Sequence, residues 1–453
     1  MKHRAVVALA VVLALTLGVG ATMALAQGVP VEKGNAKPED FPPVVGCGCH
    51  SALIDQWSKS MHAQALTDPL YLSKLAEGQK ATDGALGAFC NKCHGPAATM
   101  TGEIGNKQLS AGVAGGVNCT WCHQAVGNAG EPANVSQLVV LDGVRRAQIK
   151  DPQAPHPAQY SAFHESAEIC GGCHNVNHPV NGMHLEATYT EWQKSPWAAE
   201  GVTCQDCHMS KAPGEIGPFT GQAAGGAPER DNLYAMTFTG AQVELGDPVL
   251  ATAMLQSAAT VKLEAPEILA SGSSDVTVTI TNVGAGHYLP TGLTEIREMW
   301  LEVYTVDEAG AKAVIGEHMF GTILEDAEGN SPAELWDAVK IKSDDRIPPR
   351  ESVTDKFSFT MPAGAEQTTL TAALFYRSAP EEMAKKAGLK NPTTEMAKAT
   401  QVVYASEQAQ LQAAKTDVGQ GKFFDGLNLF VALAGLAVVA GIVFWFTRRK
   451  RTA

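Results

Sequence analysis

Apolar and polar residues alternate along much of the C-terminal half of the chain. Val276–Thr281 and Trp300–Tyr304 place every second side chain on an apolar face, and turns rich in Gly, Asp and Asn separate such stretches. This pattern is typical of strands that bury one face. We therefore expect an antiparallel β-sandwich over residues 256–378. The charged and Gln-rich sequence that follows predicts an exposed helical stalk over residues 379–425.

Residues 27–255 have a different character, because they lack any long helical or strand periodicity and are rich in Gly, Pro and Ala. A segment of this composition cannot bury enough apolar side chains to form a conventional core. We expect short helices and loops with little sheet, built around a bound group that supplies the missing buried surface.

Two uninterrupted apolar runs lie near the ends of the 453-residue chain. Residues 1–26 combine a basic start, an apolar stretch and a final Ala-Leu-Ala, which predicts a secretory signal peptide; an uncleaved anchor helix is the alternative. Residues 426–447 contain no charged side chain and are long enough for a transmembrane helix. A buried core helix is the alternative there, but the basic residues 448–453 that follow favour a cytoplasmic tail. We therefore expect a single-pass cell-membrane protein with its domains on the periplasmic or extracellular side.

The formal net charge of -13 makes the chain acidic. Nucleic acid is a poor partner for an acidic surface, whereas basic proteins are favoured.

Ten cysteines in an exported chain would ordinarily predict disulfides, but eight of them fall in four C-x-x-C-H motifs. The motif residues are Cys90, Cys93 and His94; Cys119, Cys122 and His123; Cys170, Cys173 and His174; and Cys204, Cys207 and His208. Two thiols at this spacing reach the two vinyl groups of a haem, and the adjacent histidine becomes an axial ligand of the iron. A thioredoxin-like pair or a zinc site would not place a histidine after every second cysteine. The motifs predict four haem c groups.

A fifth, shortened site reads Cys47-Gly48-Cys49-His50. With one intervening residue, both thiols are poorly placed for two thioether bonds, although one bond from Cys49 remains feasible. We expect a fifth haem here, bound irregularly; a degenerate site without haem or a reactive vicinal pair are the alternatives.

Histidines outside the motifs are the candidates for the second axial ligand of each iron, which would make the haem low-spin. They are His62, His156, His164, His178, His184, His287 and His318. The segment around His318 is also typical of an ordinary strand. His62 lies in a repeat, since Trp57–Ala63 and Trp192–Ala198 share the pattern W-x-K-S-x-x-A. His287 lies in a Gly-rich loop that could reach over a haem or form a plain hairpin turn. For His156 and His178, an exposed loop position is the alternative.

These pieces resemble the cytochrome c-552/c-554 group of multihaem cytochromes. Trp57–Ala63, Glu191–Pro196 and Gly201–Met209 carry the resemblance, which covers residues 43–210, and Gly286–Gly292 is similar to a C-terminal β-domain attached to such cytochromes. The resemblance implies closely stacked, mostly bis-histidine haems used for electron transfer, with His62 at a distal-ligand position. The shortened first site and the C-terminal anchor depart from it.

We therefore expect a membrane-tethered relay that passes electrons from a quinol-linked membrane donor or redox protein to another partner. An enzyme with one open haem acting on a small nitrogen or sulfur oxyanion is the first alternative, although no C-x-x-C-K motif of the kind that marks such catalytic haems is present. A haem-bearing subunit of a larger assembly is the second.

Overall fold

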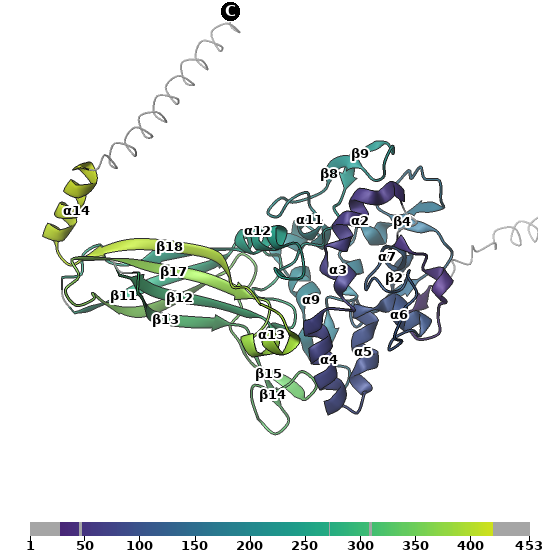
Figure 1. The fold of residues 1–453 in the computed structure, drawn as a ribbon, viewed down its shortest axis with the longest axis horizontal. Helices are drawn as coiled ribbons and strands as arrows, with labels where there is room; N and C mark the ends of the chain where they lie inside the picture. The colour runs from purple at the N-terminus through teal and green to yellow at the C-terminus, as the bar shows by residue number, and fades with distance from the viewer. Residues whose placement is uncertain (1–27, 45–47, 271, 308–309, 420–453) are drawn as a thin grey trace, which may run out of the picture.

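A computed structural model describes residues 28–44, 48–270, 272–307 and 310–419 of the chain (Figure 1). The short helices lie at one end of the molecule, and the long strands form the other end. The predicted signal peptide, membrane span and basic tail lie outside the described residues, as does Cys47. Within the described ranges, no helix is both long and apolar enough to cross a lipid bilayer.

Most of the N-terminal domain (residues 28–247) consists of short helices joined by loops, with a few strands of two to five residues. Its elements are β1 (Val29–Pro30), η1 (Pro38–Asp40), η3 (Gly48–His50), α2 (Ser51–Ser58), α3 (Met61–Gln64), α4 (Pro69–Ala81), α5 (Ala85–His94), α6 (Pro96–Thr101), α7 (Cys119–Cys122), β2 (Ala125–Asn128), β3 (Gln137–Val139), β4 (Arg145–Ala147), β5 (Ala158–Tyr160), η4 (Ala162–His164), α8 (Glu168–Gly171), β6 (Val176–Asn177), β7 (His184–Glu186), α9 (Thr188–Gln193), α10 (Pro196–Ala199), α11 (Cys204–His208), β8 (Phe219–Gln222) and β9 (Glu229–Leu233).

The C-terminal domain (residues 248–419) is built mainly from long antiparallel strands. Its elements are α12 (Pro248–Ala258), β10 (Ala259–Glu264), β11 (Ser273–Asn282), η5 (Thr294–Ile296), β12 (Glu298–Val306), β13 (Lys312–Phe320), β14 (Thr322–Asp326), β15 (Ala338–Asp344), β16 (Ser352–Thr360), β17 (Gln367–Arg377), α13 (Glu381–Ala387), β18 (Thr394–Tyr404) and α14 (Glu407–Gly419).

Two antiparallel sheets, β10-β11-β16 and β13-β12-β17-β18, share one apolar core. Ile280 of β11, Leu301 of β12 and Leu374 of β17 are fully buried within it. The alternation predicted from the sequence places these side chains inward and their polar neighbours outward, which is why the two sheets pack face to face. The expectation of antiparallel strands in this region is confirmed.

Two boundaries differ from the sequence-based expectation. The domain change expected at residue 255 falls inside α12, because Leu255 of that helix packs into the core of the strand domain. The segment expected to be a helical stalk contains α13, β18 and α14, and β18 pairs with β17 along its length. Thr394, Met396 and Val403 of β18 are buried while the intervening residues stay more exposed. The charged residues around this strand obscured its alternation in the sequence.

Candidate haem-binding sites

Each complete C-x-x-C-H motif lies on a short helical turn. The motifs occupy the end of α5, the whole of α7, the end of α8 with the residues after it, and the whole of α11. Side chains inside or beside the motifs begin two of these turns: Asn118 accepts a hydrogen bond from Trp121 N at 2.9 Å, and Asp206 accepts one from Thr203 N at 2.7 Å. Each motif thus places two cysteines and a histidine on or directly beside one short helical turn.

The five motif histidines share one contact, which orients their rings. Nδ1 of four of them lies against a main-chain carbonyl oxygen, and Nδ1 of the fifth lies against a carboxylate. The contacts are His50 with Ala223 O (2.8 Å), His94 with Ala65 O (2.8 Å), His123 with Arg146 O (2.6 Å), His208 with Thr239 O (2.6 Å) and His174 with Glu186 Oε1 (3.2 Å). A ring that donates from Nδ1 keeps the Nε2 lone pair for a metal ion, and metal-binding histidines are typically held in this way.

Four of these histidines face the ring of a second histidine. The pairs and their centroid separations are His50 and His156 (6.2 Å), His62 and His174 (6.2 Å), His123 and His164 (5.8 Å), and His208 and His287 (6.2 Å). Two imidazoles that bind one metal ion at about 2 Å each have centroids about 6 Å apart. Moreover, the buried Nδ1 of His164 has no hydrogen-bond partner, so this ring has a nitrogen available to a metal ion. The residues present therefore fit haem with two histidine ligands.

Burial favours the neutral form of three of these rings, as metal ligation requires. It lowers the pKa of His62 to about 3 and the pKa values of His164 and His208 to about 4. His174 differs: burial opposes its charged form, but the hydrogen bond and the negative charge of Glu186 raise its pKa to about 9.

His94 has a different neighbour. The ring of Tyr71, from α4, stacks on it with centroids 3.6 Å apart and planes inclined by 5°. The Tyr71 hydroxyl donates to Asn91 Oδ1 at 2.8 Å, so the phenol is held beside α5. Among the described residues, no histidine ring pairs with His94. The site therefore offers one histidine ligand where the other four offer two.

The three remaining ligand candidates have other surroundings. Nδ1 of His178 accepts hydrogen bonds from Val180 N and Asn181 N, and its Nε2 lies 3.4 Å from Trp336 O. His184 is exposed on β7. His318 lies on β13 with its Nδ1 2.8 Å from Asp355 Oδ2. The structure brings none of them opposite a motif histidine.

The tryptophans of the sequence repeat make equivalent contacts. Trp57 Nε1 donates to Val117 O and Trp192 Nε1 donates to Val202 O, both at 2.9 Å. Each acceptor lies two residues before the first cysteine of a motif. The repeated helix thus anchors the start of a haem-attachment turn in both copies. At the position of His62, the second copy has Trp197, whose ring lies 4.4 Å from the guanidinium of Arg350.

The motif of His174 lies beside the other complete motifs. The Cys93 thiol lies against that of Cys173, and the Cys170 thiol lies against that of Cys204. Cys122 lies within electrostatic range of Cys170 and Cys173 and packs on the same apolar cluster as Cys173. The attachment sites therefore form one connected group with the His174 motif at its centre.

Sequence reasoning missed the groups that hold the ligands. A main-chain carbonyl group that orients a histidine cannot be recognised from the sequence, because every residue has one. Ala223, for example, is 173 residues from His50, whose ring it orients. Glu186 is an acidic side chain twelve residues after His174, but nothing in the sequence distinguished it from the other acidic residues.

The chain is similar to known multihaem cytochromes. Residues 47–124 match the family described as cytochrome c554 and c-prime. The crystal structure of a penta-heme cytochrome c552 from Thermochromatium tepidum is similar over 82% of this chain and 100% of that chain, with a TM-score of 0.58 and 19% identity. No curated protein matches the chain. The chain thus has a multihaem cytochrome-like N-terminal domain followed by antiparallel sheets.

Two further solved structures resemble only part of the chain. One is AvmM, described as catalysing macrocyclization in alchivemycin A biosynthesis (TM-score 0.20, 13% identity, 33% of this chain and 90% of that chain). The other is the sporulation control protein Spo0M from Bacillus subtilis (TM-score 0.16, 14% identity, 32% and 49%). Scores this low carry no argument about fold or function.

Proposed function

We propose that the chain carries five covalent haems and transfers electrons between redox partners outside the cytoplasmic membrane. The observation that carries the proposal is the set of four facing histidine pairs, each with one ring anchored through Nδ1. Haem held in this way supplies reversible one-electron exchange at iron. The protein's part is to fix both imidazoles and leave no coordination position for water.

The contacts between attachment sites support the relay further. Electron exchange between neighbouring haems requires the groups to lie close together, and the thiols of Cys93, Cys173, Cys170 and Cys204 bring three motifs into contact. No substrate pocket is needed for this activity.

The test is a haem count combined with low-temperature EPR on the oxidised full-length chain in detergent. We expect mass spectrometry of the intact chain to give five haems per chain, and integrated EPR to give four low-spin irons per chain. A His62→Ala variant should keep all five haems but lose one low-spin signal, because the thioethers of the Cys170–Cys173 motif do not depend on His62. If high-spin iron dominated the wild-type spectrum, the relay proposal would fail.

A second candidate function rests on the His94 site. A haem with one histidine ligand has an open position where a small molecule binds, as an enzyme acting on a nitrogen or sulfur oxyanion would require. The iron at His94 should then give one high-spin EPR signal per chain, and the reduced chain should bind one carbon monoxide. Steady turnover of nitrite or sulfite would favour the enzyme, whereas ligand binding without turnover would favour the relay.

Membrane attachment is part of the proposal and is supported by the sequence pattern of residues 1–26 and 426–447. Expression of the full chain should place the haem protein in the membrane fraction. A chain that ends before residue 426 should be released by osmotic shock with its haems in place. Recovery of the full chain in the soluble fraction would contradict the anchor.

A further inference from the structure

The loop that carries His287 belongs to the C-terminal domain but lies against the N-terminal domain. Gly286 packs against Trp192 and Trp197, since a Cβ at this position would lie 3.3 Å from the first ring and 3.6 Å from the second. Gly284 is closer still to its neighbour, with Ser257 O only 2.2 Å from where a Cβ would lie. The two glycines therefore let the backbone approach both domains closely.

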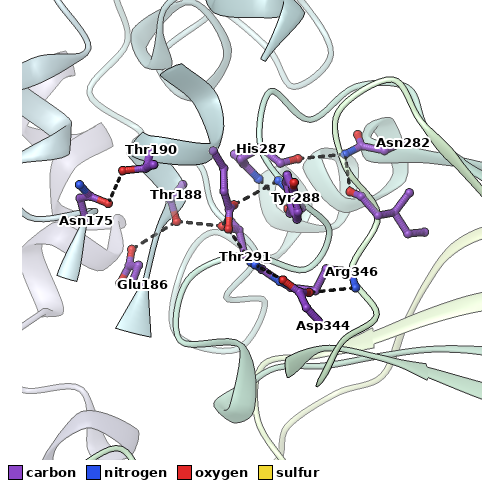
Figure 2. A network of polar contacts seen from close by, with 12 residues as sticks. Asn175, Glu186, Thr188, Thr190, Asn282, His287, Tyr288, Thr291, Asp344 and Arg346 are labelled. Atoms are coloured by element: carbon purple, nitrogen blue, oxygen red, sulfur yellow. Dashed lines mark hydrogen bonds and ion pairs between the residues drawn. The ribbon is translucent and has the colours of Figure 1, made fainter. Parts of the chain in front are cut away.

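Glu191 of α9 holds this loop from the N-terminal domain through Tyr288 and Thr291. Figure 2 shows these two loop residues beside His287 and Arg346. The Glu191 side chain is 6% exposed. One carboxylate oxygen accepts from Tyr288 N at 3.2 Å and from Thr291 Oγ1 at 2.7 Å, and the other accepts from Arg346 Nη1 at 2.5 Å. The backbone that Glu191 holds is that of the residue directly after His287, and Tyr288 O in turn accepts from His287 Nδ1 at 2.9 Å.

Arg346 completes the arrangement from the C-terminal domain. It is 8% exposed, bonds to both carboxylate oxygens of Asp344 at 2.8 Å, and places its guanidinium 4.9 Å from the ring centroid of Tyr288. The next residue, Ile347, pairs with Leu289 of the loop through two main-chain hydrogen bonds of 2.9 and 3.0 Å. Arg346 thus contacts Tyr288 of the loop, Asp344 at the end of β15 and Glu191.

We propose that the buried Glu191–Arg346 ion pair is the positioning device that holds His287 opposite His208, so that docking of the C-terminal domain sets the second axial ligand of that haem. This inference rests on the proposal that His208 and His287 share an iron. Loss of the Arg346 charge leaves the Glu191 carboxylate buried without a cation, and loss of the Glu191 charge leaves Arg346 with Asp344 alone and no ion pair to α9. Either change favours release of the loop from α9.

The chain offers a matched control in a second ion pair across the same interface. Arg350 bonds to Glu200, with side chains 40% and 51% exposed. Solvent screens this pair. Within the described residues its two side chains make no hydrogen bond or ion pair to the His287 loop, and the Arg350 guanidinium lies 4.4 Å from the ring centroid of Trp197. A Glu200→Gln variant therefore removes an interdomain ion pair without touching the contacts of Glu191.

The experiment compares Glu191→Gln, Glu200→Gln and His287→Ala in the full-length chain, by EPR and resonance Raman at equal haem content. We expect His287→Ala to convert one further iron per chain to high-spin. Glu191→Gln should convert a substantial part of that same iron, and added imidazole should restore the low-spin signal. Glu200→Gln should match the wild type.

Two results would overturn the inference, and they are distinguishable. If His287→Ala becomes high-spin while Glu191→Gln stays like the wild type, the ligand assignment stands and the positioning role fails. If His287→Ala changes nothing, the proposed ligation fails as well.

A milder variant keeps the test open if Glu191→Gln does not fold. Thr291→Val removes the 2.7 Å bond to Glu191, together with the 2.9 Å bond between the hydroxyls of Thr291 and Thr188, and leaves the ion pair in place. It should produce a smaller high-spin fraction at the same iron, and a purely low-spin spectrum would count against the proposal.

Discussion

Glu186 is the one carboxylate that anchors a motif histidine in the described part of the chain, and we expect it to set a reduction potential. The other four motif histidines donate to neutral carbonyl oxygens, whereas His174 donates to Glu186 Oε1. An anionic acceptor makes the imidazole a stronger electron donor and stabilises ferric iron. The haem of His174 should therefore have the most negative potential of the four histidine-paired haems, and Glu186→Gln should raise it.

The size of the shift follows from the geometry. The rings of His62 and His174 are 6.2 Å apart and Glu186 lies 3.2 Å from Nδ1, so the midpoint between the rings is roughly 7 Å from the carboxylate. The Glu186 side chain is only 15% exposed, which justifies an effective dielectric constant of about 20 rather than that of water. One unit charge then contributes about 2 kcal/mol, or about 100 mV for a one-electron couple. Glutamine still accepts the hydrogen bond, so the substitution removes charge and keeps the ring in place.

The assay is a spectropotentiometric titration of the full chain, with EPR of poised samples to follow the His62–His174 haem. The most negative low-spin component should move up by about 100 mV in Glu186→Gln. Glu168→Gln is the control, because Glu168 is an exposed carboxylate on the helix of the same motif, where water screens its charge. Equal shifts in the two variants, or no shift in Glu186→Gln, would refute the reasoning.

Three further predictions concern other parts of the chain. Burial raises the pKa of Glu295 to about 7, above its ordinary 4.5. Between these pH values the folded protein binds more protons than the unfolded protein, so the free energy of unfolding falls as pH rises. Glu295→Gln should remove this fall and be more stable than the wild type at pH 8 by about 1–3 kcal/mol, but not at pH 4, in urea unfolding at both pH values. Leu301→Ala opens a cavity in the fully buried strand core and should cost about 2–5 kcal/mol in the same assay, with unchanged haem content. Tyr71→Phe keeps the ring on His94 and loses the bond to Asn91, so it should change the affinity of the iron at His94 for carbon monoxide without changing the haem count. Identical carbon monoxide binding curves for the variant and the wild type would show that the phenol hydroxyl has no part in ligand binding.

The motif cysteines and histidines were predictable because thioether attachment requires them to be close in sequence. The histidines that we propose as second ligands could be predicted from the sequence only as a pool of candidates, since such a histidine comes from wherever the chain passes over the iron. His164 lies 41 residues from the ring that it faces, and His156 lies 106 residues from His50. Composition therefore identified these candidates together with His178, which has main-chain partners instead.

The ion pair of Glu191 was even harder to predict from the sequence. Glu191 was visible beside the repeated tryptophan, but its partner Arg346 is 155 residues away, and nothing in either local sequence links them. A buried ion pair across two domains depends on how the domains dock, which local periodicity does not encode. Strand alternation, by contrast, is a local pattern, and it located the sandwich core well except at β18, where charged neighbours masked it.

The arrangement of the motifs determines which observation separates a relay from an enzyme. The His174 motif contacts the motifs of His94 and His208, so the anionic anchor Glu186 acts at the centre of the group. The His94 motif, with one histidine ligand, lies at the edge of this group and touches the centre through Cys93. Both functions require the same central contacts, because an open site must also exchange electrons with the rest of the chain. Potentials of the paired haems therefore do not discriminate between the two functions, and the chemistry at His94 does.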